Sequence, residues 1–326
     1  MWRPLLWIFL LACTSSASPP AWRLATSTNE PAALLSVWGT SASDVWVTGG
    51  RSELTGAPAI LHLDGKAWTR VDSGQHGIDL WWVFGFEGGD VFFTGSGGTI
   101  LRERDGAIEK MTTPRSGIIF GLWGASSSDL WAVGSGDDGH GIVWRYDGAT
   151  WQDVGAAVAD LPSLVLKVHG QRTDDVWISC AGGAALHWDG AALTKMPTGT
   201  KSSLFSIVTT PDVVVAVGGY TGLGEILEYD GTAWTELPSL IPVAWRGAAA
   251  SADQVYAVGV SGAAAQRTAT GWQLLDRPPT QLDFHAAWVD PQGGLWGVGG
   301  KFDTVPLTQE GFLAYYGVAT PPEVSP

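Results

Sequence analysis

One short pattern occurs seven times along this chain, and the repetition limits the possible folds more than any other feature of the sequence. The clear copies are VWGTSASDVWVTGG (37–50), VFGFEGGDVFFTGS (83–96), LWGASSSDLWAVGS (122–135) and VHGQRTDDVWISCA (168–181). Weaker copies are IVTTPDVVVAVGG (207–219), AAASADQVYAVG (248–259) and WVDPQGGLWGVGG (288–300). Equivalent positions in successive copies lie 38 to 46 residues apart, which suits a unit of four short strands.

The second half of a repeat carries a tight-turn signal. Alternating polar and apolar residues surround an Asp-Gly pair in ILHLDGKAW (60–68), IVWRYDGATW (142–151), ALHWDGAAL (185–193) and ILEYDGTAW (226–234). Glycine accepts the positive φ that two-residue hairpin turns require, so this pattern predicts a hairpin. Each repeat therefore contains four strands, which we name a to d in chain order.

A large aromatic residue recurs at one place in strand b. These residues are Trp46, Phe92, Trp131, Trp177, Tyr256 and Trp296. Buried aromatic side chains contribute strongly to packing, and a position shared by nearly all repeats favours a structural role. We expect these residues to pack between neighbouring units.

The two ends of the repeat array complement each other. The seventh repeat supplies strands a, b and c, but the chain then ends in the Pro-rich ATPPEVSP without a Trp-bearing strand d. The segment Ala21-Trp22-Arg23-Leu24 precedes the first repeat and matches Ala67-Trp68-Thr69-Arg70. We therefore predict an all-β, seven-bladed β-propeller over residues 21–317, closed by an N-terminal strand that completes the last blade. Residues 318–326 are expected to form a disordered tail.

The N-terminus reads as an export signal. Residues 1–13 combine one positive charge with an apolar run too short to span a bilayer permanently, and residues 14–20 form a tether. Leu10-Leu11-Ala12-Cys13 is similar to the lipobox of bacterial lipoprotein precursors, which implies lipidation of Cys13 and a membrane anchor. With Thr14 next, the similarity favours the outer membrane of the cell envelope. The alternative is ordinary cleavage after Ala17, giving a secreted or periplasmic protein.

The amino-acid composition limits the classes of partner that this chain could bind. The net charge is −14 with only 18 Lys and Arg spread along the chain, which argues against nucleic-acid binding. The 44 glycines and 19 tryptophans fit many short strands and turns and do not fit a disordered chain. Cys180 is the one cysteine besides Cys13, so an acylated Cys13 leaves no intrachain disulfide, and Cys180 is expected to be a small buried apolar residue.

The WG…DVWAVG…YDGxxW repeats resemble those of secreted β-propeller lipoproteins of Gram-negative bacteria. They are more distantly similar to Asp-box and tectonin-type propellers. The resemblance covers residues 21–317 and implies the fold, but propellers host enzymes, lectins and scaffolds alike. Because the Asp-Gly turns lack the Ser or Thr that opens a full Asp-box, the resemblance does not extend to sialidase activity.

Ligands of such rings usually bind the face formed by the b–c and d–a connections, where strand a begins. The candidate binding residues there are Trp81, Trp82, Phe120, Lys167, Phe205, Trp245, Arg246 and His285. Aromatic rings with cationic groups around a depression suit a protein or carbohydrate ligand. The alternative is that most of them plug the channel or pack between blades.

Metal and catalytic signals are weak. Asp137, Asp138 and His140 could offer ligands to Ca²⁺, but their spacing is not that of an EF-hand. Asp72, His76 and Asp79 form a similar cluster. No nucleophile elbow, HExxH or Walker A motif occurs, and no cofactor is expected. A glycosidase pair could arise from Glu53, Asp137, Glu225 or Asp303 only if the fold brought two of them together.

These observations favour a non-enzymatic binding or scaffold protein. Three alternatives stay open: a lectin-like module, a propeller-type glycosidase or lyase, and a subunit of an outer-membrane assembly machine.

Overall fold

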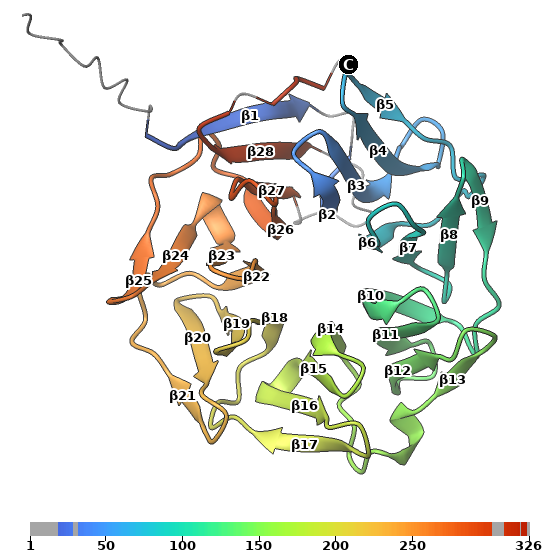
Figure 1. Cartoon of the computed structure of the whole chain (residues 1–326), viewed down its shortest axis with the longest axis vertical. Helices are drawn as coiled ribbons and strands as arrows, with labels where there is room; N and C mark the ends of the chain where they lie inside the picture. Colours follow the sequence, from blue (N-terminus) through green and yellow to red (C-terminus); the bar gives the residue numbers. More distant parts are fainter. Residues whose placement is uncertain (1–18, 29–31, 302–309, 320, 325–326) are drawn as a thin grey trace, which may run out of the picture.

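In the computed structural model the repeats form seven four-stranded antiparallel sheets arranged in a ring (Figure 1). The structure describes residues 19–28, 32–301, 310–319 and 321–324. Strand a of every blade lines the central channel, and strand d lies at the rim (Figure 1). The prediction of a seven-bladed, all-β propeller is confirmed.

The strands follow the repeats in order. Blade 1 contains β2 (Leu34–Ser41), β3 (Asp44–Arg51), β4 (Pro58–Asp64) and β5 (Trp68–Arg70). Blade 2 contains β6 (Leu80–Gly85), β7 (Val91–Gly95), β8 (Ile100–Arg104) and β9 (Ala107–Lys110). Blade 3 contains β10 (Gly117–Ser126), β11 (Asp129–Gly136), β12 (Gly141–Tyr146) and β13 (Trp151–Asp153). Blade 4 contains β14 (Val165–Arg172), β15 (Asp175–Cys180), β16 (Ala184–Trp188) and β17 (Leu193–Pro197).

The second half of the ring has the same order. Blade 5 contains β18 (Leu204–Thr209), β19 (Val214–Tyr220), β20 (Leu223–Tyr229) and β21 (Trp234–Glu236). Blade 6 contains β22 (Trp245–Ala250), β23 (Val255–Gly259), β24 (Ala264–Thr268) and β25 (Gly271–Leu274). Blade 7 contains β26 (Asp283–Val289), β27 (Leu295–Gly300), β28 (Gly311–Gly317) and β1 (Ala21–Thr28). Short 3₁₀ turns occur at η1 (Gly155–Ala157), η2 (Ala181–Gly183) and η3 (Val260–Gly262).

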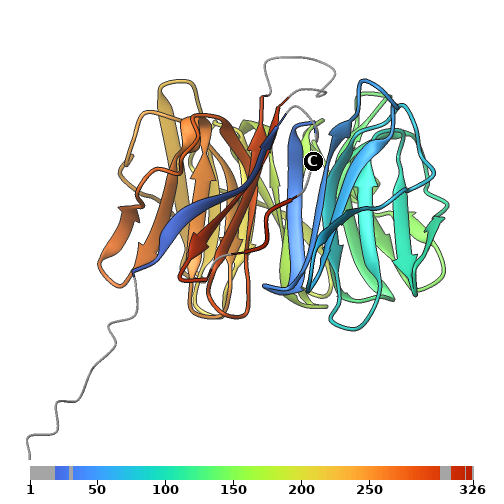
Figure 2. The same ribbon diagram turned by 90° about the horizontal axis from the view of Figure 1, so that it is seen from above.

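The N-terminal strand closes the ring as predicted. β1 pairs with β28 and places Trp22 opposite Tyr316, the register in which Trp151 faces Tyr146 in blade 3. Figure 2 shows β1 running beside β28 on the outside of the ring. The Trp22 ring lies 5.4 Å from that of Phe284, so this strand also contributes to the core of blade 7.

The C-terminal segment adds to this seam. The Trp68 indole Nε1 of blade 1 donates to the carbonyl of Pro322 at 3.0 Å, and the Val324 amide donates to the carbonyl of Ala25 at 3.0 Å. Residues 321–324 thus contact blades 1 and 7, while disorder of the tail stays a prediction. The buried indole N–H of Trp68 needs an acceptor, and the Pro322 carbonyl supplies it.

The Trp-Gly pair at the end of strand a reflects packing between adjacent blades. A Cβ atom on Gly85 would lie 2.7 Å from the Trp38 ring of the preceding blade, and one on Gly170 would lie 2.6 Å from the Trp123 ring. Glycine in one blade thus makes room for the tryptophan of the blade before it. Between blades 4 and 5 a hydrogen-bonded pair replaces this contact, with His169 Nδ1 2.9 Å from Thr209 Oγ1.

The strand-b aromatics pack between blades, which confirms the prediction. Trp131 is fully buried, and its ring lies 5.6 Å from Trp188 of the next blade. Trp296 is also fully buried and lies 6.2 Å from Trp68 across the seam.

The acidic residue that begins strand b orients these aromatics. Asp129 Oδ1 accepts a 3.0 Å hydrogen bond from Arg145 Nε, and the Arg145 guanidinium lies 5.2 Å from the Trp131 ring centroid. In blade 4, Asp175 lies 2.9 Å from His187 Nε2, and the His187 ring stacks on Trp177 at 4.0 Å. The repeated Asp of the sequence pattern is thus explained by structure alone.

The Asp-Gly turns have the expected geometry. Asp230 Oδ1 accepts hydrogen bonds from the backbone amides of Thr232 at 2.8 Å and Ala233 at 3.0 Å, while Gly231 has φ of +96°. Hydrogen bonding from the Thr232 hydroxyl and these amides lowers the pKa of Asp230 to about 2. Equivalent hydrogen bonds from the backbone amides of their own turns lower the pKa values of Asp64, Asp147 and Asp189.

Within the described ranges, no helix is long and apolar enough to cross a membrane. Cys180 is fully buried, and burial raises the pKa of its thiol to about 12, in agreement with the expected packing role.

Candidate functional site

All seven innermost strands contain a β-bulge at the same point of the repeat. The bulge residues are Leu35, Trp81, Phe120, Leu166, Phe205, Arg246 and His285. A bulge inserts one residue into a strand and redirects its side chain out of the regular alternation. We call these seven residues the bulge ring. They lie near the start of strand a, on the face formed by the b–c and d–a connections.

The side chains of the bulge ring meet at the channel axis. The Trp81 and Phe120 rings are 5.2 Å apart in a perpendicular arrangement, and Trp81 lies 5.8 Å from His285. Because β2 separates β6 from β26, the second contact requires both side chains to extend into the channel. In the adjacent blades 5 and 6, the Arg246 guanidinium lies 4.4 Å from the ring centroid of Phe205.

The structure sorts the eight candidate binding residues by their position relative to the bulge. Five of them belong to the bulge ring: Trp81, Phe120, Phe205, Arg246 and His285. Trp82 and Lys167 come one residue later, and the Lys167 ammonium lies 4.1 Å from the Trp82 ring centroid. A ligand-binding role for these seven stays a prediction.

Trp245 does not belong with the others. It comes one residue before the bulge, is 0% exposed and packs in the core between blades 5 and 6. A shift of one residue along a strand turns a side chain to the opposite face, so Trp245 occupies the buried position that Leu34 and Leu80 hold in other blades. A ligand on the surface cannot reach it.

Two members of the bulge ring were missed from the sequence. Leu35 and Leu166 are aliphatic and carry no chemical signal of their own. Aligning strand a of all seven repeats would have placed both beside Trp81 and Arg246.

Three basic residues lie at the axis. His285 Nδ1 lies 2.6 Å from the carbonyl oxygen of Leu35, and burial followed by the charges of Lys167 and Arg246 lowers the pKa of His285 to about 3. Lys167 is 5% exposed and donates to the carbonyl of Phe120 at 2.6 Å, and burial lowers its pKa to about 7. Burial also lowers the pKa of Arg246.

Arg246 and Lys167 have no acidic partner in contact among the described residues. No carboxylate of the described residues forms an ion pair with Arg246 or Lys167, although Asp283 lies near enough to raise the pKa of Arg246. Most of the other arginines pair with carboxylates, as Arg267 does with Glu228 at 2.9 Å. A protein of net charge −14 thus keeps a positively charged centre on its axis.

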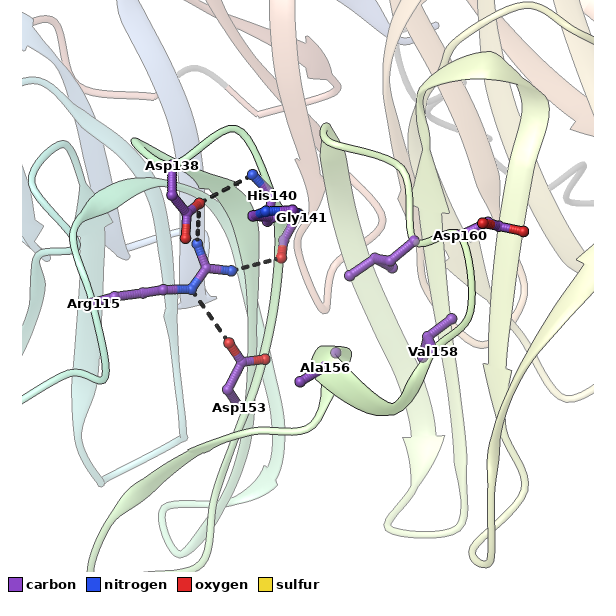
Figure 3. Close-up of a pocket in the computed structure, with 10 residues that line it drawn as sticks. Arg115, Asp138, His140, Gly141, Asp153, Ala156, Val158 and Asp160 are labelled. Atoms are coloured by element: carbon purple, nitrogen blue, oxygen red, sulfur yellow. Dashed lines mark hydrogen bonds and ion pairs between the residues drawn. The ribbon is translucent and has the colours of Figure 1, made fainter.

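The loop considered for metal binding has a different role. Figure 3 shows Arg115 between Asp138 and Asp153, with Nη1 2.9 Å from Asp138 and Nε 3.3 Å from Asp153. Asp137 accepts a hydrogen bond from Ser116 instead, and the His140 amide donates to Asp138. The guanidinium already supplies the positive charge that a cation would bring. Among the described residues, no three His, Cys, Asp or Glu side chains converge as a metal site.

This loop borders a cleft of about 440 Å³ between blade 3 and the connection from β13 to β14, with Val158 and Asp160 on its opposite wall (Figure 3). Its central arginine is neutralised by two carboxylates, so Arg115 is not available to an anionic ligand.

The remaining acidic candidates also bond separately. Glu225 is 4% exposed and accepts hydrogen bonds from the hydroxyls of Thr200 and Ser202, both at 2.9 Å. Asp79 pairs with Arg51 at 3.1 Å, whereas His76 Nδ1 lies 3.2 Å from the carbonyl of Thr55. Cys13 and Asp303 lie outside the described residues. Neither described cluster assembles a pair of carboxylates for acid–base chemistry.

No protein-family model and no curated protein sequence matches this chain. Solved structures match over nearly its whole length. YCF48 bound to D1 peptide is 16% identical with a TM-score of 0.68, covering 92% of this chain and 95% of that one. The U3-55K structure is 12% identical with a TM-score of 0.71, covering 92% of this chain and 100% of that one. Streptogramin B lyase is 13% identical with a TM-score of 0.68, covering 93% and 100%. At these identities, the likenesses establish that this chain shares the propeller fold with all three.

Proposed function

We propose that this protein is a lipid-anchored, non-enzymatic binding protein of the bacterial cell envelope. Its bulge ring is the centre of a site for an acidic segment of a partner protein. Cys13 carries the lipid anchor in this proposal, and the propeller presents the b–c and d–a face to the partner.

The observation that carries the proposal is Arg246. Its guanidinium lies half-buried against Phe205 with no carboxylate partner among the described residues. A buried guanidinium without an acceptor is unfavourable, and an acidic side chain of a ligand would supply charge-assisted hydrogen bonds. Trp81 and Phe120, two partly exposed members of the bulge ring, add apolar surface to the same face.

The arrangement of the aromatic rings favours a protein over a glycan. Sugars stack on open aromatic faces, but the Trp81 ring meets Phe120 edge to face and the face of Phe205 is covered by Arg246. Protein segments tolerate such a mixed apolar and cationic surface.

The structural neighbours support binding without settling it. One neighbour is described as bound to a peptide, and another is described as a lyase, so the fold permits either class. A non-enzymatic role is favoured because the acidic groups Glu225 and Asp138 are each engaged with separate partners.

A random-peptide display library tests the binding proposal. We expect selection on the soluble propeller to enrich peptides with Asp or Glu, and Arg246→Met to weaken their binding at least about tenfold. Arg172→Met is the matched control, because Arg172 is exposed and pairs with Asp174 at an a–b turn on the opposite face. Enrichment of neutral peptides, or equal losses in both variants, would contradict the proposal. Binding to a glycan panel that requires Trp81 would favour the lectin alternative.

Lipidation is tested separately. In a Gram-negative host, the wild-type chain should incorporate labelled palmitate and sediment with membranes, whereas Cys13→Ser should do neither. Unlabelled wild-type protein in the periplasm or medium would instead support ordinary signal cleavage.

A further inference from the structure

A second space lies on the axis, on the other side of the bulge ring. It has a volume of about 170 Å³ and is bordered by the innermost strands of six blades. Its principal side chains are Trp38, Trp82, Phe84, Lys167, His169 and Trp288. These residues follow the bulge in their strands, so the cavity extends toward the a–b turns.

Lys167 gives this cavity a chemical character. Its ammonium donates to the carbonyl of Phe120 at 2.6 Å and lies 4.1 Å from the Trp82 ring centroid. An ammonium carries three N–H donors, and a carbonyl with one aromatic face accounts for two of them. No carboxylate of the described residues pairs with Lys167, so its positive charge is buried without a counter-ion.

Burying an unpaired charge is costly unless something compensates it. The other polar side chains that line the cavity are His169 and Ser206, and neither is acidic. His285 lies near enough for the charges of Lys167 and Arg246 to lower its pKa. An anion in the cavity would supply the partner that the Lys167 ammonium lacks among the described residues.

The size and walls of the cavity limit that anion. A dry cavity of about 150 Å³ holds a molecule the size of benzene. Apart from Lys167, His169 and Ser206, the walls are aromatic and aliphatic side chains, which favour an apolar body over a hydrated ion such as phosphate. We propose that the axial cavity binds a small organic carboxylate with a body of about one aromatic ring, its carboxylate against the Lys167 ammonium.

This site is independent of the proposed partner-binding role. It lies beyond the bulge ring from the b–c face and uses Lys167 where the partner site uses Arg246. Either proposal can fail while the other stands.

Benzoate, benzamide and benzylamine are matched probes, because they share one ring and differ in charge. By calorimetry and ligand-observed NMR, we expect wild-type protein to bind benzoate at least about tenfold more tightly than either other probe. Lys167→Met retains the length of the stem and removes the charge, and it should lower benzoate affinity at least about tenfold. Arg246→Met should leave benzoate affinity unchanged.

Equal affinity for benzoate and benzamide would overturn the proposal, as would a benzoate affinity that depends on Arg246 and not on Lys167. If Lys167→Met fails to fold, Ala250→Leu provides a second test, because Ala250 lines the cavity and the change reduces its volume with the charge retained. Ala250→Leu should weaken benzoate binding, and an unchanged affinity in a folded Ala250→Leu protein would also overturn the proposal.

Discussion

Two positions of the same repeat have opposite properties. The strand-b position is aromatic in six repeats, and where it is Trp131 or Trp296 the side chain is fully buried against the next blade. The bulge position differs from blade to blade, with two leucines, two phenylalanines, a tryptophan, an arginine and a histidine. The first position builds the ring and must satisfy the same neighbours in every blade. The second faces the axis, where each side chain has a different environment and is free to differ.

The contrast indicates where function resides in a repeat protein. Positions that repeat are explained by packing, as the Asp129–Arg145–Trp131 group is. Positions that vary inside the repeated fold are not explained by packing in this way, and we propose that they carry the function, with Arg246 as the clearest example.

The largest effect should come from opening the ring. Deleting residues 21–28 removes β1, exposes β28 and leaves the last blade with three strands. We expect loss of much of the stability of about 5–15 kcal/mol that single domains have, measured as a large fall in the thermal midpoint. An unchanged midpoint would show that closure of the ring does not depend on this strand. The division between a strand-b position that builds a closed ring and a variable bulge position would then be contradicted.

A matched pair of substitutions compares the two positions directly. Trp131→Ala should cost about 3–5 kcal/mol, because it leaves a cavity between blades. Trp81→Ala removes the same side chain from the partly exposed bulge ring, and we expect less than half that cost. Urea unfolding of both variants measures the difference. Equal costs would mean that the bulge ring is part of the core.

The Trp-Gly pairing is tested by a coupled substitution. Gly85→Ala places a Cβ atom against the Trp38 ring and should cost about 1–3 kcal/mol. Adding Trp38→Leu removes the obstructing ring, so the double variant should be more stable than the sum of the single effects predicts. Strictly additive unfolding energies would indicate that the two residues do not interact.

The smallest effect is expected from acid. The four turn aspartates have pKa values lowered by backbone hydrogen bonds, so they bind protons less readily in the folded state. Their stabilisation is present above the unfolded pKa of about 3.9 and is lost as the pH falls toward about 2, the folded value of Asp230. Urea midpoints across this range should decline, and Asp230→Asn, which keeps the acceptor oxygen, should reduce the slope. If the urea midpoint of the variant depends on pH as steeply as that of wild type, Asp230 does not contribute to the acid sensitivity.

Much of the propeller fold could be predicted from sequence, because the packing between blades is local and repeated. The register of Trp22 and the inter-blade role of the strand-b aromatics followed from comparing repeats. The site was harder to predict. Trp245 was assigned to it because a bulge shifts the alternation by one residue, and propensity carries no signal for that shift.

Other features required three-dimensional proximity. Arg115 and Asp138 lie 23 positions apart in sequence, and their ion pair depends on how a d–a connection meets a b–c loop. The cavity at Lys167 collects side chains from six blades, so no single segment of the sequence indicates it.

The most direct test of the central claim is a charge exchange between Arg246 and a selected acidic peptide. Arg246→Glu should abolish measurable binding of that peptide, and replacing the acidic residue of the peptide with Lys should restore binding to the variant and weaken it to the wild type. Restoration in the exchanged pair would place the ligand's acidic group against the bulge ring. Binding that is insensitive to Arg246→Glu, or not restored by the exchange, would contradict the account.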